Sequence, residues 1–202
     1  MTSPDLASLN ASALCRCVDR VRAPLVAQPD CLGCRGTGVR NRVRDRVLAN
    51  NARRRVPTMA EFLAFRGDHC HRLYAQLPQD WCCPGCARTK FQILRWTRKF
   101  PGKPHAHMGW AGGYHEHHDH GGDARQFRGR FGRFAPTVIC EQCNNADTAA
   151  KRTLGLPRDF SFSPTEIRQF VVGSPHGDHL IDYDIARDIY ARWQALAPPM
   201  FF

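Results

Sequence analysis

Cys83-Pro-Gly-Cys86 and Cys140-Glu-Gln-Cys143 are the two stretches of this sequence that decide its fold. Both are C-x-x-C motifs, and two such pairs supply four thiolates to one tetrahedral zinc ion at zinc–sulfur distances of about 2.3 Å. Four buried cysteines without a metal would leave the repeated spacing unexplained. We therefore expect these four cysteines to hold a structural Zn²⁺.

The sequence between the motifs is rich in histidine. It contains His115-Glu-His-His-Asp-His120, and Asn144 directly follows the second motif. Hydrolysis of a phosphodiester needs a base that activates water and a cation that neutralises charge on the leaving oxygen. Histidine suits the base role because its ordinary pKa is about 6.5. Mg²⁺ prefers oxygen ligands such as a carboxylate and an Asn carbonyl.

This arrangement resembles the HNH, or ββα-metal, endonuclease superfamily, and within it the four-cysteine members of the phage endonuclease VII type. Those members carry a first C-x-x-C motif, an Asp-His-Asp-His-like run at the end of a hairpin strand, and a C-x-x-C-Asn motif that opens a helix. Arg128-Gly129 also resembles the Arg-Gly found upstream of their second pair. The corresponding residues here are Cys83, Cys86, His117 to His120, Cys140, Cys143 and Asn144.

The resemblance covers about residues 81–155. It implies an α+β fold in which a zinc-stabilised ββα-metal nuclease core carries flanking helices. It also implies a metal-dependent endonuclease that hydrolyses DNA to 5′-phosphate and 3′-hydroxyl ends, with a histidine general base and one catalytic divalent cation. Phage DNA processing, restriction and anti-phage defence would all suit such a protein.

The resemblance leaves two registers of the site open. In one, Asp119 binds the catalytic metal and His120 is the base. In the other, His117 binds the metal and His118 is the base, and a histidine ligand would favour first-row metals such as Mn²⁺ or Ni²⁺. Strand alternation places His117 and Asp119 on one face. We expect Asp119 and Asn144 to bind Mg²⁺ or Mn²⁺, and we keep both histidines as candidate bases.

Three charged residues follow Asn144 on the expected helix. Asp147 lies one turn further on. We expect it to be a solvated acid near the helix N-terminus rather than a further metal ligand. Lys151 and Arg152 are expected either to contact a phosphate or to be ordinary charges at the end of the helix.

The composition favours a polyanionic partner. Lysine and arginine number 29 against 18 acidic residues, which gives a net charge of +11. The basic residues concentrate in segments 35–55 and 88–103 and around the second cysteine pair, and phosphate contacts of this kind give affinity without sequence information. The expected partner is DNA, contacted by Arg128, Arg130, Lys151 and Arg152.

Two other functions fit parts of the pattern. A zinc-stabilised nucleic-acid-binding protein without nuclease activity would keep the cysteines and arginines but would not need the clustered histidines, Asp119 and Asn144. A metal-storage or sensor protein would leave the basic segments unexplained. A protein partner and a homodimer both remain open.

The N-terminal region holds a second group of cysteines. Cys31-Leu-Gly-Cys34-Arg-Gly-Thr-Gly is similar to one repeat of a DnaJ-type zinc module, but a single repeat implies no chaperone function. We expect a possible second zinc site from Cys15, Cys17, Cys31 and Cys34. Cys70 and Cys82 stay unassigned, as spare thiols.

The sequence predicts four segments. These are an N-terminal zinc module and basic arm (1–55), a linking helix (56–80), the nuclease core (81–155) and a C-terminal helical extension (156–202). Its first ten residues lack a basic region followed by an apolar run, so no signal peptide is expected, and no stretch is apolar enough to span a membrane. Paired cysteines without an export signal indicate zinc ligands in a reducing cytoplasm.

Local signals predict several element boundaries. Thr58 with Glu61 forms a capping box that should open a helix through about Leu73. Ser163 with Glu166 forms another, and a last helix is expected over 183–196. The helix after Cys143 should end near Gly155, residues 109–122 should form a hairpin or turn, and His176 and His179 should be exposed loop residues.

Overall fold

The computed structural model describes residues 43–121 and 132–196. The chain divides into two units, 1–49 and 50–202, and of the first unit only part of a helix over 43–52 is described. The proposed ligands of the second zinc ion and the pair Arg128 and Arg130 lie outside the described residues. No described helix has the combination of length and apolar character that crossing a membrane requires.

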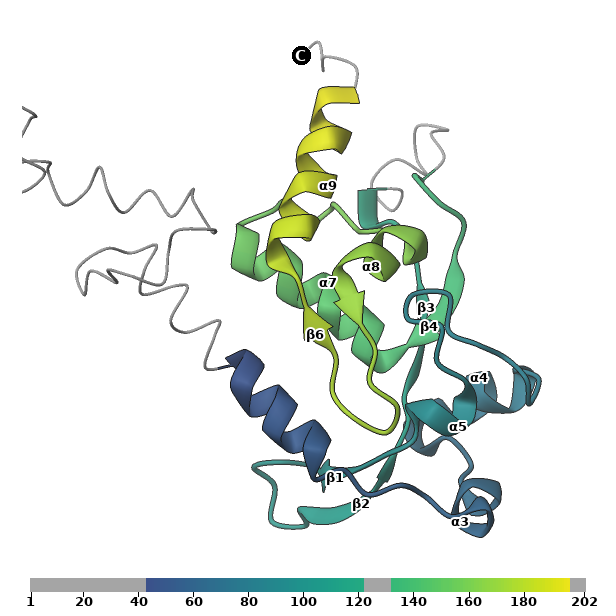
Figure 1. The fold of residues 1–202 in the computed structure, drawn as a ribbon. Helices are drawn as coiled ribbons and strands as arrows, with labels where there is room; N and C mark the ends of the chain where they lie inside the picture. Colours follow the sequence, from purple (N-terminus) through teal and green to yellow (C-terminus); the bar gives the residue numbers. More distant parts are fainter. Residues whose placement is uncertain (1–42, 122–131, 197–202) are drawn as a thin grey trace, which may run out of the picture. The chain divides into compact units, whose positions relative to one another are not determined.

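The second unit combines short helices with small antiparallel sheets, as Figure 1 shows, which fits the α+β class. The described helices are α3 (Met59–Ala64), the 3₁₀ helix η2 (Asp68–Cys70), α4 (His71–Gln76), α5 (Lys90–Ile93), α7 (Glu141–Leu154), α8 (Pro164–Phe170) and α9 (Tyr183–Leu196). The described strands are β1 (Arg95–Lys99), β2 (His107–Ala111), β3 (Tyr114–His117), β4 (Thr137–Cys140), β5 (Val171–Val172) and β6 (Leu180–Ile181).

Both predicted capping boxes are confirmed, since the hydroxyl of Thr58 accepts from Glu61 and that of Ser163 accepts from Glu166. The helix that Thr58 opens is shorter than predicted and ends at Ala64 rather than near Leu73. The backbone becomes extended at Phe65, Gly67 then adopts a left-handed φ of 86° before η2, and α4 starts at His71. By contrast α7 ends at Gly155 as predicted, again in the left-handed region, and α9 spans the predicted residues.

The glycine-rich region after β2 joins two different sheets instead of forming one hairpin. β2 pairs with β1, whereas β3 pairs with β4 in the register Tyr114 opposite Cys140 and His117 opposite Thr137. Gly113 lies at the junction because a Cβ there would come within 2.7 Å of the Cβ of Glu141. The result is a β3–β4 pair that runs directly into α7.

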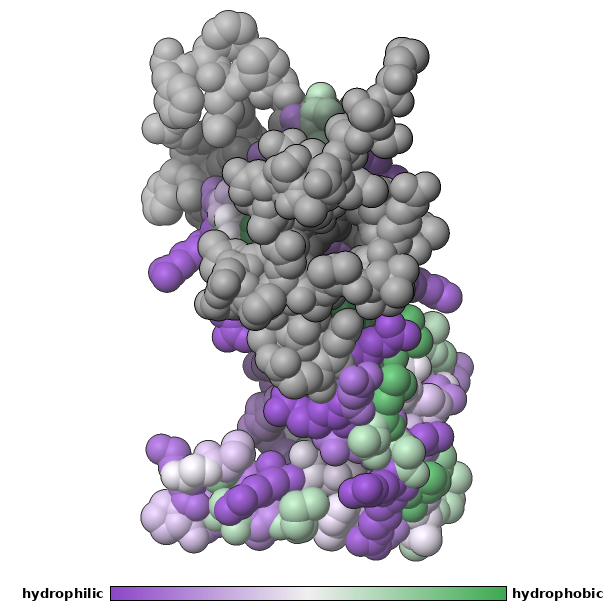
Figure 2. Space-filling view, turned by 60° about the vertical axis from the view of Figure 1, so that its left-hand side comes forward, coloured by the Kyte–Doolittle hydropathy of each residue, from purple (hydrophilic) through white to green (hydrophobic). Residues whose placement is uncertain are grey.

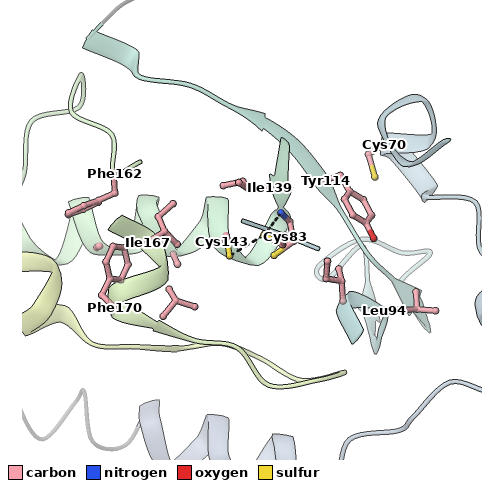
Figure 3. Packing of buried hydrophobic residues seen from close by; sticks show 14 of the residues in the cluster. Cys70, Cys83, Leu94, Tyr114, Ile139, Cys143, Phe162, Ile167 and Phe170 are labelled. Atoms are coloured by element: carbon pink, nitrogen blue, oxygen red, sulfur yellow. Dashed lines mark hydrogen bonds between the residues drawn. The ribbon is translucent and has the colours of Figure 1, made fainter. Parts of the chain in front are cut away.

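One buried core joins the cysteine motifs to the C-terminal helices. α8 and α9 both pack on α7. Figure 3 shows Cys83 and Cys143 between Leu94 and Tyr114 on one side and the apolar side chains that follow α7 on the other. The C-terminal members labelled there are Phe162, Ile167 and Phe170, all at most 1% exposed. Segments 81–155 and 156–196 therefore fold around a shared interior.

Candidate functional site

The four cysteines of the two C-x-x-C motifs converge at the junction of β4 and α7. Their sulfur atoms all lie within 4.8 Å of one another, with Cys83 to Cys143 and Cys86 to Cys140 both at 3.8 Å. A zinc ion with bonds of about 2.3 Å to sulfur needs tetrahedral edges of about 3.8 Å. The thiolate set and its spacing thus fit the expected Zn²⁺.

Local backbone geometry holds these sulfurs in place. The backbone N–H of Cys140 donates to the sulfur of Cys83 at 3.3 Å. In the first motif the N–H of Ala87 donates to the carbonyl of Cys83 at 2.7 Å, and Ala87 adopts a left-handed φ of 59° to close the turn. Hydrogen bonds with Cys140 lower the pKa of Cys86 and raise the pKa of Cys83 and Cys143, while the bond with Cys143 lowers the pKa of Cys140. A bound metal would require all four as thiolates.

Arg88 is a buried cation beside this cluster that the sequence reasoning placed in a nucleic-acid-binding segment. It is 2% exposed. Its Nε lies 3.4 Å from the sulfur of Cys86 and its Nη2 lies 3.6 Å from that of Cys140. The guanidinium also donates to the carbonyls of Ser174 and Gly177, at 3.0 and 3.2 Å. It therefore compensates thiolate charge and ties the 174–177 loop to the cluster.

His179 and His176 are buried, so their expected place in an exposed loop is wrong. His179 is 9% exposed, and its Nε2 lies 3.4 Å from the sulfur of Cys143 and 3.9 Å from that of Cys140. His176 is 7% exposed, and its Nδ1–H donates to the carbonyl of Leu94 at 2.9 Å. The loop is drawn inward by its bonds to Arg88, which a local pattern of glycine and polar residues does not reveal.

Asn144 contacts His117, the histidine of the second register. His117 Nδ1 lies 3.3 Å from Asn144 Oδ1, and its Nε2 lies 2.7 Å from the carbonyl oxygen of Phe162. β3 ends at His117, and Asn144 lies in the first turn of α7, so the β3–β4 pairing brings the two side chains together. The ring of Phe134 stacks on that of His117 at a centroid distance of 5.3 Å.

Asp119 has different partners from those that the first register requires. Its carboxylate accepts from the backbone N–H of Arg133 at 2.8 Å and from that of Gly121 at 3.3 Å. Asp119 and His117 are both buried, while His118 is half-buried and His120 is exposed, but β3 ends at His117, so Asp119 lies beyond the strand. The rings of His118 and His120 lie 4.6 Å apart.

The charges further along α7 are also placed differently from expectation. Asp147 is 3% exposed rather than solvated, because its carboxylate accepts from the backbone N–H of Phe162 at 2.9 Å. Lys151 pairs with the same carboxylate at 2.8 Å and has a side chain only 13% exposed. Arg152 is exposed on α7. Of the expected phosphate contacts on this helix, only Arg152 presents its side chain fully to solvent.

The two unassigned cysteines lie apart from the metal-binding set. Cys70 is buried and its thiol donates to the carbonyl of Gly67 at 2.8 Å, whereas Cys82 is exposed. Within the described residues, only the four motif cysteines gather three or more cysteine, histidine or acidic ligand atoms at one point.

Comparisons of the chain with protein-family models, with curated proteins and with solved structures found no match.

Proposed function

We propose that this chain is a metal-dependent HNH endonuclease that hydrolyses DNA, with His117 and Asn144 as ligands of the catalytic cation and His118 as the general base. The contact between His117 Nδ1 and Asn144 Oδ1 carries the proposal. It supports the second register, because Asn144 faces His117 while the carboxylate of Asp119 accepts from two backbone N–H groups.

The hydrogen bond of His117 to Phe162 determines which nitrogen carries the proton. A carbonyl oxygen can only accept, so Nε2 must donate to Phe162 O at 2.7 Å. In a neutral imidazole, Nδ1 is then an acceptor, and it faces a second acceptor, Asn144 Oδ1, at 3.3 Å. His117 is buried and Asn144 half-buried, and a cation bound by both acceptors would stabilise this close approach.

The proposed site divides the work between the bound metal and the protein. A divalent cation bound there would neutralise charge on the phosphate and on the departing oxygen. The carbonyl of Phe162 orients His117, which the ring of Phe134 also supports. His118, the next residue after β3, would take the proton from the attacking water. A nitrogen ligand favours Mn²⁺ or Ni²⁺ over Mg²⁺.

Cleavage of supercoiled plasmid by the purified full-length protein tests this proposal. We expect nicking with Mn²⁺ or Ni²⁺ and slower nicking with Mg²⁺, and a loss of about 100- to 10,000-fold in His118→Ala. Asn144→Ala should be inactive, whereas Asn145→Ala, the exposed neighbouring amide on the same helix, should be active. Equal activity in both Asn variants would contradict the proposed ligand.

Further variants separate the registers and the role of the amide. Asn144→Asp should keep cleavage, because a carboxylate also binds a cation, whereas an amide acting only as a hydrogen-bond donor to His117 could not be replaced in this way. His117→Asp should shift the metal preference toward Mg²⁺. If His120→Ala and Asp119→Asn abolish cleavage while His118→Ala and His117→Ala do not, the first register is correct.

The alternative function is a zinc-stabilised DNA-binding protein without nuclease activity. Salt-sensitive DNA binding without cleavage under any of the three metals would favour it over the endonuclease. End-group analysis of the product adds a second readout, since the family resemblance implies 5′-phosphate and 3′-hydroxyl ends.

A further inference from the structure

We infer that a basic hollow beside the β1–β2 hairpin binds the phosphate backbone of DNA, a role that deepens and rests on the proposed nuclease function. The hollow has a volume of about 370 Å³ and lies entirely within the second unit. Its charged lining consists of Arg53, Arg54, Arg55, Arg95 and Arg98 with a single acid, Asp178.

Two of the five arginines are occupied by protein partners. Arg55 pairs with Glu61, and its guanidinium stacks over Trp96 at 4.3 Å from the ring centroid. Arg95 pairs with Asp178 at 2.9 Å. These two arginines therefore shape the wall of the hollow, and their charge is largely neutralised.

The other three arginines have exposed side chains. Among the described residues no carboxylate pairs with Arg53, Arg54 or Arg98. Arg54 is oriented by a bond from its Nη1 to the carbonyl of Asn51 at 2.6 Å. Guanidinium groups match phosphate oxygens with two parallel N–H donors, so three such groups around one hollow suit successive phosphates.

The floor of the hollow is hydrogen-bonded and closely packed, and it is connected to the cysteine cluster. Asn51 is 6% exposed, donates to Ser174 Oγ and to the carbonyl of Asp178 at 3.1 and 2.9 Å, and accepts from the N–H of Asp178 at 2.7 Å. Gly177 fits against it so closely that a Cβ would lie 2.3 Å from Asn51 Oδ1. Because Arg88 holds this same loop, the folding of the zinc site also preforms the hollow.

The remaining lining suits a sugar–phosphate chain. Trp96 and Met108 offer apolar surface for the sugars, and Asn50 and Thr97 offer polar groups. Figure 2 shows hydrophilic and apolar residues interspersed on the described part of the face that it presents. The arginines among the lining residues match the charge of a sugar–phosphate backbone, and such contacts give affinity without reading bases.

Fluorescence anisotropy with a labelled duplex DNA tests the inference. The full-length protein carries Asn144→Ala so that the duplex stays intact. We compare Arg53→Gln/Arg98→Gln with Arg168→Gln/Arg192→Gln, which removes the same charge from exposed positions on α8 and α9. Each lost phosphate contact should reduce the slope of log affinity against log salt by about 0.9 and weaken binding about eightfold at 0.1 M salt.

Each outcome decides the inference. A weaker, less salt-dependent complex for the hollow variant alone supports it. Equal DNA binding by the two double variants overturns it, and so does an absence of DNA binding by the parent protein. Tighter binding of a labelled nucleoside triphosphate than of DNA at the hollow also overturns it. Plasmid cleavage is measured separately with the protein in which Asn144 is intact. DNA binding through the hollow without plasmid cleavage would refute the proposed nuclease activity but support DNA binding by the hollow.

Discussion

Replacing Arg88 by Met should destabilise the protein far more than the same change at another arginine nearby. The guanidinium lies beside two thiol sulfurs and donates to Gln142 at 2.5 Å and to the carbonyls of Ser174 and Gly177. Methionine keeps the apolar stem of the side chain but lacks the guanidinium, so it leaves these acceptors unpaired and the cluster charge uncompensated.

The magnitude follows from the burial of these groups. Hydrogen bonds that involve a charged group each contribute about 1.5–3 kcal/mol, and these contributions do not add fully. Removing one partner of a buried charge network costs about 3–5 kcal/mol, which we expect for the free energy of unfolding of Arg88→Met. Loss of a group that supports metal ligands should also lower zinc affinity about 10- to 100-fold.

Urea unfolding and competition for zinc with a chromogenic chelator measure the two effects. With a slope of about 2 kcal/mol per molar urea, the unfolding midpoint should fall by about 2 M. Arg95→Met is the matched control, because the pair of Arg95 with Asp178 is half-exposed and contributes at most about 1 kcal/mol. An Arg88 variant that behaves like this control in both assays would refute the proposed role of the guanidinium.

Three other changes test the core, the cysteine cluster and the buried loop. Phe162→Ala should cost about 3–5 kcal/mol in urea unfolding because the ring is fully buried; a loss under about 1 kcal/mol would mean that the core is not as described. Cys83→Ser should abolish zinc binding and cooperative unfolding, measured by metal analysis and calorimetry, whereas the exposed Cys82→Ser should preserve both. Burial lowers the pKa of His176 below its ordinary value. The unfolded chain therefore binds this proton at a higher pH than the folded chain, and the free energy of unfolding should fall as the pH drops below about 6.5. His176→Asn should reduce this fall in urea midpoint between pH 7.5 and 5.5, and the exposed His105→Asn should not.

Short-range chemistry explains which elements the sequence predicted. The capping boxes at Thr58 and Ser163, and the glycine that ends α7, act through backbone groups within a few residues, so their signals are readable locally. The continuation of the first helix to Leu73 failed because its apolar residues pack around a break at Gly67. A Cβ at Gly67 would lie 2.4 Å from the Cβ of Tyr74, and that contact belongs to the tertiary structure.

The candidate site also has one part that the sequence predicts and one part that it does not. The spacing of the cysteines was sufficient to predict that they converge, since tetrahedral coordination imposes the same short distances on any C-x-x-C pair. From the sequence we expected Asp119 rather than His117 to bind the cation beside Asn144, on the assumption that both lie on one face of a strand. The strand β3 ends at His117, and it is His117 that contacts Asn144. The two residues have different partners: His117 lies against Phe162, and Asp119 against the backbone at Arg133.

The C-terminal residues are therefore part of the candidate site and not only an extension of it. Asp147 on α7 accepts from the N–H of Phe162, and the carbonyl of Phe162 accepts from His117 Nε2. The peptide units flanking Phe162 thus hydrogen-bond on both sides, and the bond to the Phe162 carbonyl requires a proton on His117 Nε2. Since Nδ1 is the only nitrogen of His117 left to face Asn144, the chemistry of the proposed metal ligand depends on a residue that lies beyond segment 81–155.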